Sequence, residues 1–278
     1  MLQLALSGLA TTAGLMFAAW LMSLPLRNVA IVDIFWGLAV AGAGATWLLL
    51  AAPGPRGALA VLLAVVWGGR LALHILWRAR GKPEDRRYRE IRARNEPNFA
   101  FKSLYLVFLL QAVLAWLIAA PLFGAVVGPV QGAGQPLGIV DLFAAALWFA
   151  GFLLQAVADL QMARFQQRPA AERAVMDQGL WRYSRHPNYF GETLMWWSLW
   201  LIAAAGGAWW TFIGPLLLTV LLLKVSGVAL TEKDIATRRP AYERYIPPTT
   251  ALAPLPPRAC GDSSDPARSP SAAGAFPP

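Results

Sequence analysis

Long blocks of apolar residues constrain the fold of this chain more than any other feature. The blocks are apolar all round, so each belongs either in lipid or in the interior of a protein. A helix of about 20 residues crosses a bilayer whose hydrocarbon core is about 30 Å thick. Seven segments of this kind follow one another: Leu2–Leu24, Val29–Ala51, Gly57–Trp77, Leu104–Val127, Leu137–Leu160, Asn188–Ala205 and Ala208–Leu230. The sequence therefore predicts an all-α, polytopic membrane protein with seven transmembrane helices.

The distribution of positive charge predicts how these helices are oriented. Nine basic residues lie within residues 78–102, five within residues 164–185, and six from residue 233 onward. Because Lys and Arg are enriched in cytoplasmic loops, the C-terminus is predicted to be cytoplasmic and the N-terminus to be outside. Arg56, in the loop after the second segment, is the one basic loop residue that this orientation places outside. The Ala-, Arg- and Pro-rich composition favours a bacterial inner membrane.

Composition also predicts the extent of the folded part. Residues 1–246 are predicted to form one transmembrane helical domain, with a cofactor-binding half over residues 137–246. Residues 247–278 are rich in Pro, Ala, Ser and Gly, and we expect a disordered tail there. The first apolar segment is too long for a signal-peptide core and no basic residue precedes it, so we expect it to be retained. Cys260 is the only cysteine and the two histidines are isolated, which leaves no disulfide within the chain and no metal site.

A dense polar cluster, Arg-His-Pro-Asn-Tyr-Phe-Gly-Glu at residues 185–192, leads directly into the sixth apolar segment. A charged group at the centre of a span costs about 2.5–3.5 kcal/mol unless it is paired, so such groups usually face a protein interior or a wet cavity. Asn188 and Glu192 are four residues apart and so share one face of a helix. We expect this face and Asp159 of the fifth segment to point toward the same place. Amide and carboxylate side chains are suited to holding a carboxamide such as that of nicotinamide. Alternatively, His186 and the proline after it serve only to start a helix.

Two arginine-rich loops flank this cluster on the same side of the membrane. Residues 78–102 carry Tyr88 between two arginines, and residues 161–187 hold Arg164, Arg173 and Arg185 among others. Guanidinium groups bind phosphates through paired, charge-assisted bonds, so an anionic cofactor could dock from the cytoplasm. Positive-inside bias with anionic lipid head groups is the simpler alternative, and we expect no nucleic-acid partner. A glycine-rich strand–turn–helix fingerprint is missing, which excludes a doubly wound dinucleotide domain.

Ionisable residues inside the spans are a second group of candidates. Asp33 lies near the start of the second segment, and Arg70 and His74 lie one turn apart in the third. Asp33 and Arg70 either form a structural ion pair between helices or act on a ligand. Asp141, at the uncharged outer end of the fifth segment, is predicted to be an interfacial cap.

Several motifs together resemble the C-terminal half of the steroid 5-alpha-reductase superfamily. They are Gly-Leu-Trp-Arg-Tyr-Ser-Arg-His-Pro-Asn-Tyr-Phe-Gly-Glu at 179–192, Leu-Thr-Glu at 230–232 and Tyr-Glu-Arg-Tyr-Ile-Pro at 242–247, with Asp-Ile-Phe-Trp-Gly at 33–37, Glu-Asp-Arg-Arg-Tyr at 84–88 and Ala-Asp-Leu-Gln at 158–161. Most of residues 28–257 is covered, and the chain is most similar to the bacterial DUF1295 subgroup. Sterol reductases and isoprenylcysteine carboxyl methyltransferases share a related Arg-His-Pro-x-Tyr-x-Gly element.

The resemblance implies a membrane reductase that binds NADPH from the cytoplasmic side and reduces the conjugated C=C bond of a hydrophobic enone. The partners expected are therefore the bilayer and a hydrophobic or lipid substrate. In the steroid enzymes a Gln-Glu pair in the second span and a Tyr in the third polarise the ketone. Here these spans offer Asp33, Arg70 and His74 instead, so another enone or an unsaturated lipid is as good a candidate as a steroid. Residues that we assign to cofactor binding are Asp159, Gln161, Arg164, Arg173, Arg185, His186, Asn188, Tyr189, Glu192, Tyr242 and Tyr245.

Hydride addition to an enone moves negative charge onto the carbonyl oxygen, so a hydrogen-bond donor must lie there in a dry pocket. Arg70, a protonated Asp33 or Tyr88 could provide it, and we predict these three as catalytic residues. Two alternatives remain. One is an S-adenosylmethionine-dependent methyltransferase, and the other is a non-enzymatic membrane protein or transporter whose ionisable residues line a permeation path. Most polar groups gather at one end of the spans, which favours a binding site.

Overall fold

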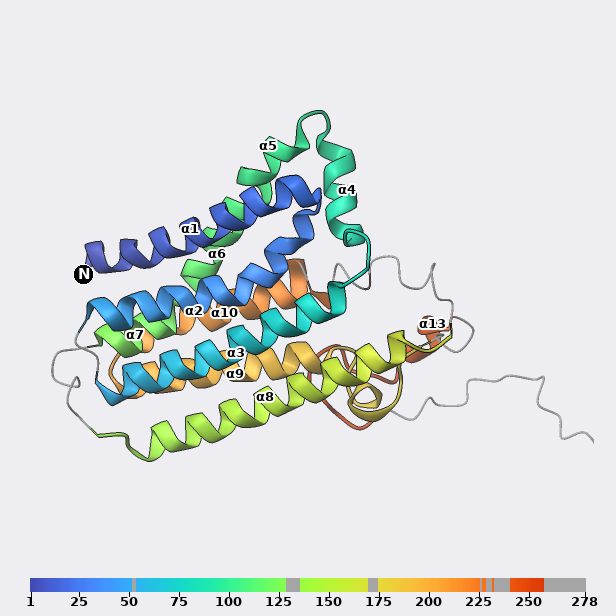
Figure 1. Ribbon diagram of the computed structural model, residues 1–278. Coiled ribbons are helices and arrows are strands. Elements are labelled where there is room, and N and C mark those ends of the chain that lie inside the picture. The colour runs from blue at the N-terminus through green and yellow to red at the C-terminus, as the bar shows by residue number, and fades with distance from the viewer. Residues whose placement is uncertain are drawn as a thin grey trace, which may run out of the picture.

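The computed structural model describes residues 1–51, 54–128, 136–169, 175–225, 227–228, 232 and 241–257. Within these ranges the regular structure is helical, and the longer helices run alongside one another while α4 lies across their ends (Figure 1). The α-helices are α1 (Leu2–Leu26), α2 (Val32–Leu50), α3 (Pro55–Ala79), α4 (Arg86–Asn95), α5 (Phe99–Ser103), α6 (Leu110–Ile118), α7 (Ala120–Val127), α8 (Ile139–Gln166), α9 (Pro187–Ala205), α10 (Ile213–Val220) and α13 (Tyr242–Tyr245). Shorter 3-10 and π-helical turns are η1 (Val29–Ile31), η2 (Leu104–Leu109), η5 (Gly179–Arg182), η6 (Trp209–Phe212) and η7 (Leu221–Val225).

The chain is a polytopic integral membrane protein. Among the described residues, five helical segments are long and apolar enough to cross a bilayer: Leu2–Leu26, Val29–Leu50, Pro55–Ala79, Phe99–Ile118 and Ile139–Gln166. Trp209–Val225 is a shorter apolar helix, and α9 packs against α8, α7 and α3. The predicted helical class and membrane location are confirmed at this level, whereas the full set of seven spans and their orientation stay predictions.

The fourth apolar segment differs from its predicted form. Instead of one helix over Leu104–Val127, the span begins at Phe99, passes through η2, ends at Ile118, and is followed by the separate helix α7. Pro121 lies in the first turn of α7. A proline inside a helix removes one hydrogen bond and its ring clashes with the carbonyl four residues earlier, so the helix ends before it. Helix α7 then packs against α2, α3 and α9.

Glycines bring two pairs of helices into close contact. A Cβ atom added to Gly37 in α2 would lie 2.9 Å from the Cα of Gly68 in α3. A Cβ added to Gly191 in α9 would lie 2.6 Å from the carbonyl oxygen of Gly151 in α8. In a membrane, where helices gain little from the hydrophobic effect, small residues let the backbones pack closely. The α8–α9 contact therefore sets the distance between the polar side chains of the next turns.

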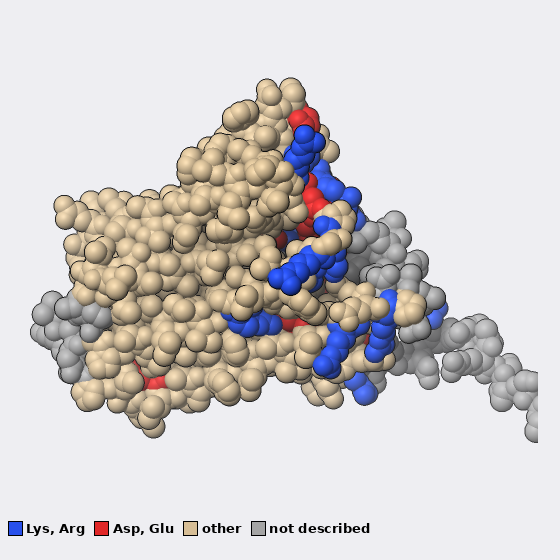
Figure 2. All heavy atoms as spheres, in the orientation of Figure 1, with Lys and Arg blue, Asp and Glu red and all other residues tan. Residues whose placement is uncertain are grey.

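Charged side chains gather at one end of the molecule, around the ends of the long helices and α4 (Figure 2). Near the opposite end, Arg56 Nε lies 2.9 Å from the fully buried Asp141 carboxylate. The same carboxylate accepts a hydrogen bond of 2.7 Å from the backbone N–H of Gly138, so Asp141 caps α8 as predicted. Arg56, the basic residue on the wrong side, is thus neutralised by an ion pair within the protein.

The C-terminal segment up to residue 257 belongs to the folded part of the chain. Arg185 N–H donates to the Thr250 carbonyl at 2.9 Å, and Leu255 N–H donates to the Tyr183 carbonyl at 3.1 Å. Thr249 is buried. Residues 247–257 were predicted to begin a disordered tail because they are rich in Pro and Ala; backbone contacts that composition does not reveal hold them in place. Residues 258–278 lie outside the described residues.

Candidate functional site

The polar motif forms the N-terminal end of helix α9. His186 lies at its N-cap with φ −140°, and Pro187 occupies the first turn, where the missing N–H costs nothing and the fixed φ suits a helix. Asn188 and Glu192 follow one turn apart. Because Gly191 lies against Gly151, this face of α9 is held directly against α8.

The central polar cluster consists of Arg70 and His74 from α3, Gln155 and Asp159 from α8, and Asn188 and Glu192 from α9. Arg70 Nη2 lies 2.7 Å from Asp159 Oδ2, and Asn188 Nδ2 donates to Asp159 Oδ1 at 3.2 Å. One turn deeper, Gln155 Nε2 donates to Glu192 Oε2 at 3.1 Å. Glu192 also interacts electrostatically with Asp159 and Arg70, so the positive charge of Arg70 acts on both carboxyl groups.

Several polar atoms of this cluster are buried without a partner. Among the described residues, the buried side-chain nitrogen and oxygen atoms that make no hydrogen bond include Arg70 Nη1, Gln155 Oε1 and Asn188 Oδ1 of this cluster, and Thr193 Oγ1 elsewhere on α9. Buried polar groups are nearly always hydrogen-bonded, and an unpaired one in an apolar surrounding costs free energy. One unpaired donor and two unpaired acceptors within the central cluster make it a candidate site for a polar ligand group.

A second group, which we call the mouth cluster, lies where α4 meets the start of α2. Tyr88 Oη donates to Asp33 Oδ1 at 2.5 Å, and Arg87 Nη2 donates to Asp33 Oδ2 at 3.1 Å. Gln111 Nε2 donates to the Tyr88 oxygen at 3.3 Å. Burial and the negative charge of Asp33 raise the pKa of Tyr88 well above its ordinary value. The phenol therefore keeps its proton and remains a donor at neutral pH.

The proposed ion pair between Asp33 and Arg70 does not form. Asp33 is paired with Arg87 and Arg70 with Asp159, because Tyr88 and Arg87 reach back over the helix ends from α4. Two of the three predicted catalytic residues, Asp33 and Tyr88, are thus in direct contact, while the third belongs to the central cluster. The positive charge of Arg78 acts electrostatically on both Asp33 and His74.

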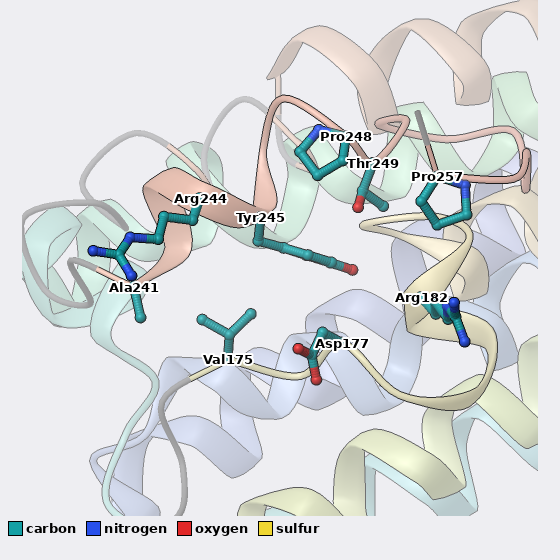
Figure 3. A pocket seen from close by; sticks show the side chains of 9 residues that line it. All are labelled: Val175, Asp177, Arg182, Ala241, Arg244, Tyr245, Pro248, Thr249 and Pro257. Carbon is teal, nitrogen blue, oxygen red and sulfur yellow. The ribbon is translucent and has the colours of Figure 1, made fainter. Parts of the chain in front are cut away.

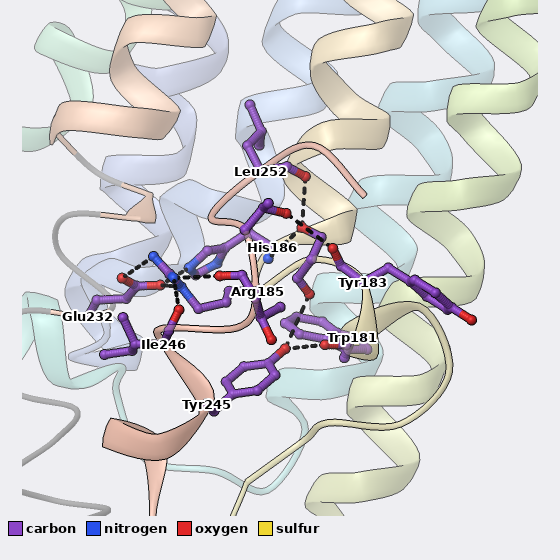
Figure 4. Close-up of polar contacts among 11 residues, drawn as sticks. Trp181, Tyr183, Arg185, His186, Glu232, Tyr245, Ile246 and Leu252 are labelled. Atoms are coloured by element: carbon purple, nitrogen blue, oxygen red, sulfur yellow. Dashed lines mark hydrogen bonds and ion pairs between the residues drawn. The ribbon is translucent and has the colours of Figure 1, made fainter. Parts of the chain in front are cut away.

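Arg185 and His186 take part in what we call the C-terminal clamp, which also includes Glu232 and the carbonyls of Ile246 and Thr249 (Figure 4). Arg185 Nε and Nη2 lie 2.8 and 3.2 Å from the two oxygens of Glu232, and Nη1 donates to the Ile246 and Thr249 carbonyls at 3.0 and 2.7 Å. His186 Nε2 lies 2.9 Å from Glu232 Oε1.

The clamp is held together by charge. Burial alone would raise the pKa of Glu232, but hydrogen bonds from His186 and Arg185 outweigh it and lower the pKa below its ordinary value. The guanidinium of Arg185 is occupied by partners within the protein, and the His186 ring stacks on Tyr189 at 5.2 Å. The clamp fixes the start of α9, and therefore the position of Asn188, two residues further on. We assign these side chains a positioning role.

Three other predicted cofactor residues hold the loop before α9. Gln161 Oε1 accepts a hydrogen bond of 3.0 Å from Leu180 N–H. Tyr245 Oη donates to the Trp181 carbonyl, and its ring meets Tyr242 edge to face at 5.2 Å. Trp181 Nε1 in turn donates to the Ala158 carbonyl at 3.1 Å, which ties the loop to α8 beside Asp159.

Of the remaining predicted phosphate ligands, only Arg164 lies within the described residues. Arg164 is exposed near the end of α8, and Arg173 lies outside the described residues. Beside the loop is an open pocket of about 440 Å³ (Figure 3), lined by Val175, Asp177, Arg182, Ala241, Arg244, Tyr245, Pro248, Thr249 and Pro257. Arg182 and Arg244, which were not assigned to cofactor binding, thus line this pocket together with residues of the C-terminal segment.

Sequence reasoning assigned no site role to Glu232 or to Thr193. Glu232 lies in the Leu-Thr-Glu motif, so a signal existed, but nothing in the sequence identified Arg185 as its partner. Thr193 carries no sequence signal, because one threonine next to a glutamate in an apolar helix is unremarkable. Gln155, spaced one turn from Asp159, could be found from helical periodicity.

One family model, described as Protein of unknown function (DUF1295), matches residues 19–249 of the chain. No curated protein and no solved structure matches the chain.

Proposed function

The chain belongs to the DUF1295 family, and we propose that it is a membrane-embedded, NADPH-dependent reductase of the conjugated C=C bond in a hydrophobic enone. The reaction consumes the enone, NADPH and one proton and yields the saturated ketone and NADP⁺. The resemblance to the steroid 5-alpha-reductase superfamily supports the reaction class. The observation that carries the proposal is the set of unpaired, buried polar atoms around the Arg70–Asp159 ion pair.

The open atoms fit a nicotinamide carboxamide. Its N–H groups need acceptors, and Asn188 Oδ1 and Gln155 Oε1 are two buried acceptors without a partner. Exposed arginines at the cytoplasmic end, among them Arg164, Arg182 and Arg244, would meet the phosphates. When bound, NADPH would supply the hydride.

Arg70 is the residue that would stabilise the charge developing on the substrate. Negative charge builds up on the carbonyl oxygen of the enone, and Arg70 Nη1 is a buried, unpaired cationic donor. Loss of one such donor typically lowers kcat by about 10²- to 10³-fold. Asp159 holds the guanidinium in place through the 2.7 Å contact. The proton that completes the reduction would reach the α carbon from an acid of the mouth cluster, and we propose Tyr88 for this step.

Ligand-dependent stabilisation of the purified protein tests the proposal directly. A ligand that binds only the folded state raises stability by about 2.7 kcal/mol at 100 times its Kd, which a thermal unfolding scan detects. We expect NADPH to raise Tm for the wild-type protein and not for Asn188→Leu. Glu90→Gln, a change in the exposed Arg86–Glu90 pair of α4, is the matched control and should respond like wild type.

The alternatives give different results in the same scan. Stabilisation by S-adenosylmethionine with no response to NADPH would identify a methyltransferase, in which Asp159 and Glu192 could hold the amine of that cofactor. No response to either cofactor would favour a transporter or another non-enzymatic protein.

A further inference from the structure

Helix α4 has one face against the protein and one face free. The first face carries residues that are buried or half-buried at helical spacing: Tyr88, Ile91, Arg92 and Asn95. The opposite face is exposed and carries Arg86, Arg89, Ala93 and Arg94. Since α4 lies across the ends of the membrane-spanning helices (Figure 1), its axis runs along the membrane surface. Together with α5 and the start of η2 it forms what we call the α4–α5 corner, residues 86–105.

Ion pairs within the protein neutralise most of the carboxylates around the corner. The pairs are Arg92 with Glu84, Arg87 with Asp33 and Asp85, and Arg86 with Glu90. The guanidinium groups of Arg89 and Arg94 make no hydrogen bond or ion pair among the described residues. Lys102 Nζ donates to the Asn95 carbonyl at 3.0 Å, which leaves two of its three N–H groups. Glu96 is the one remaining carboxylate of the corner, so the corner carries an excess of positive charge (Figure 2).

Two large aromatic rings are exposed on the same corner. Phe101 and Tyr105 are 70% and 58% exposed and lie in the first turns of the span that begins at Phe99. Trp20 Nε1 donates to the Ala100 carbonyl at 2.9 Å and so holds this part of the chain against α1. Tyrosine and tryptophan are enriched at the membrane–water interface. The corner therefore presents cations and aromatic rings at the depth where lipid head groups meet acyl chains.

We propose that the α4–α5 corner binds an anionic phospholipid of the phosphatidylglycerol class. Arg94 and Lys102 meet the phosphate by charge-assisted hydrogen bonds, and one acyl chain lies against Phe101 and Tyr105. Lys102 joins the two halves of this site, because its ammonium contacts the Asn95 carbonyl next to Arg94 while its neighbour Phe101 is exposed. A soluble anion would match the cations alone, whereas a phospholipid matches the cations and the rings at once. The inference does not depend on the proposed reductase function.

Bound lipid stabilises α4 in the position that the mouth cluster needs. The protein-facing side of α4 brings Tyr88 and Arg87 to Asp33, and Arg94 lies on the same helix. A ligand that binds only the folded state stabilises that state, so a phosphate held by Arg94 opposes the separation of α4 from the ends of the long helices. An anionic lipid is therefore a regulator of the mouth cluster that does not contact its residues.

Hydrogen exchange tests the inference. The purified full chain is placed in phosphatidylcholine nanodiscs in which the fraction of phosphatidylglycerol is raised stepwise, and amide exchange over residues 86–105 is followed by mass spectrometry. We expect exchange to slow with a saturable midpoint, and high salt to raise that midpoint because it screens exposed charges. Exchange over residues 86–105 that does not depend on phosphatidylglycerol overturns the inference.

Charge variants locate the site. Each basic residue near a membrane surface adds about fivefold in affinity for anionic lipid, so Arg94→Gln should raise the midpoint about fivefold and Arg94→Gln with Lys102→Gln about 25-fold. Arg94→Gln removes no side-chain contact among the described residues, so its result does not depend on the Lys102 hydrogen bond. Lys82→Gln with Arg168→Gln is the matched control, because it removes two exposed cations from the charged end but outside the corner. Equal midpoints for the two double variants would mean a general attraction between charges and would contradict the site.

A second comparison separates a lipid from a soluble anion. Phe101→Ser removes a ring from the corner, whereas Phe149→Ser removes a ring that is 56% exposed on α8, and only the first should raise the midpoint. Inorganic phosphate or an acidic peptide of glutamates, added to phosphatidylcholine nanodiscs, should leave the exchange unchanged. If either slows exchange as strongly as phosphatidylglycerol does, the corner binds a soluble anion or an acidic partner, and the lipid assignment fails.

Discussion

Replacing Gly191 with alanine puts a methyl group where α8 and α9 have no room for it. The added Cβ would lie 2.6 Å from the carbonyl oxygen of Gly151 and 2.7 Å from the backbone nitrogen of Gln155. Both neighbours are backbone atoms and cannot turn away, so the helices themselves must separate. Ordinary van der Waals contact begins at 3.4 Å, which requires a shift of about 0.8 Å.

A shift of this size reaches the site directly. The hydrogen bond from Gln155 to Glu192 measures 3.1 Å, and the same displacement would lengthen it to about 3.9 Å, beyond a useful hydrogen bond. Overpacking typically costs about 1–3 kcal/mol, which for a chain of this size lowers Tm by about 2–10 °C. We therefore expect a lower Tm together with weaker stabilisation by NADPH.

Thermal unfolding of the purified protein in lipid nanodiscs, with and without NADPH, measures both effects. Gly14→Ala in α1 is the control, because a Cβ there meets nothing within 4 Å and alanine favours a helix by about 1 kcal/mol. The reasoning is refuted if Gly191→Ala unfolds at the same temperature as Gly14→Ala and responds equally to NADPH.

Three further predictions concern the charged groups. Asp33→Asn and Glu192→Gln should each abolish enone reduction, measured as NADPH oxidation, while membrane insertion is unchanged; full activity in both variants would remove them from the site. Because the pKa of Glu232 is lowered in the fold, the stability that it contributes is present above its ordinary pKa and is lost as the pH falls through the lowered value. Glu232→Gln should therefore lower Tm at neutral pH and flatten the acid side of a Tm–pH curve, and an unchanged curve would contradict the clamp. At the other end, Asp141→Asn should cost about 1.5–3 kcal/mol, the contribution of a hydrogen bond to a charged group, because it removes the counter-charge of the partly exposed Arg56, and a wild-type Tm in a melting scan would refute this.

The long helices could be predicted because the apolar blocks themselves determine them. Helical spacing was also sufficient to place Asn188 and Glu192 on one face, which the structure brings against Asp159. The end of the fourth span before Pro121 could have been predicted from the proline itself. The continuous apolar run over Leu104–Val127 indicated one span instead. In physical terms, local propensity and hydropathy act over one helix at a time.

Partners contributed by distant helices could not be predicted in this way. Arg70 binds Asp159, which lies on another helix, and Arg185 binds Glu232, which lies 47 residues further along the chain. Nothing in local sequence distinguishes these pairings from the expected Asp33–Arg70 pair or from a phosphate ligand at Arg185. The same holds for residues 247–257, whose order depends on backbone hydrogen bonds to the loop before α9.

The transfer of labelled hydride tests the central claim most directly. The purified protein in nanodiscs is mixed with a long-chain enone and with NADPH that carries deuterium at the reactive C4 position. The mass of the ketone product is then measured by mass spectrometry. The account predicts a saturated ketone carrying one deuterium at the β carbon, and no such product from Arg70→Met. Recovery of unchanged enone with either C4 epimer of the labelled NADPH, from protein that is folded and inserted, would contradict it.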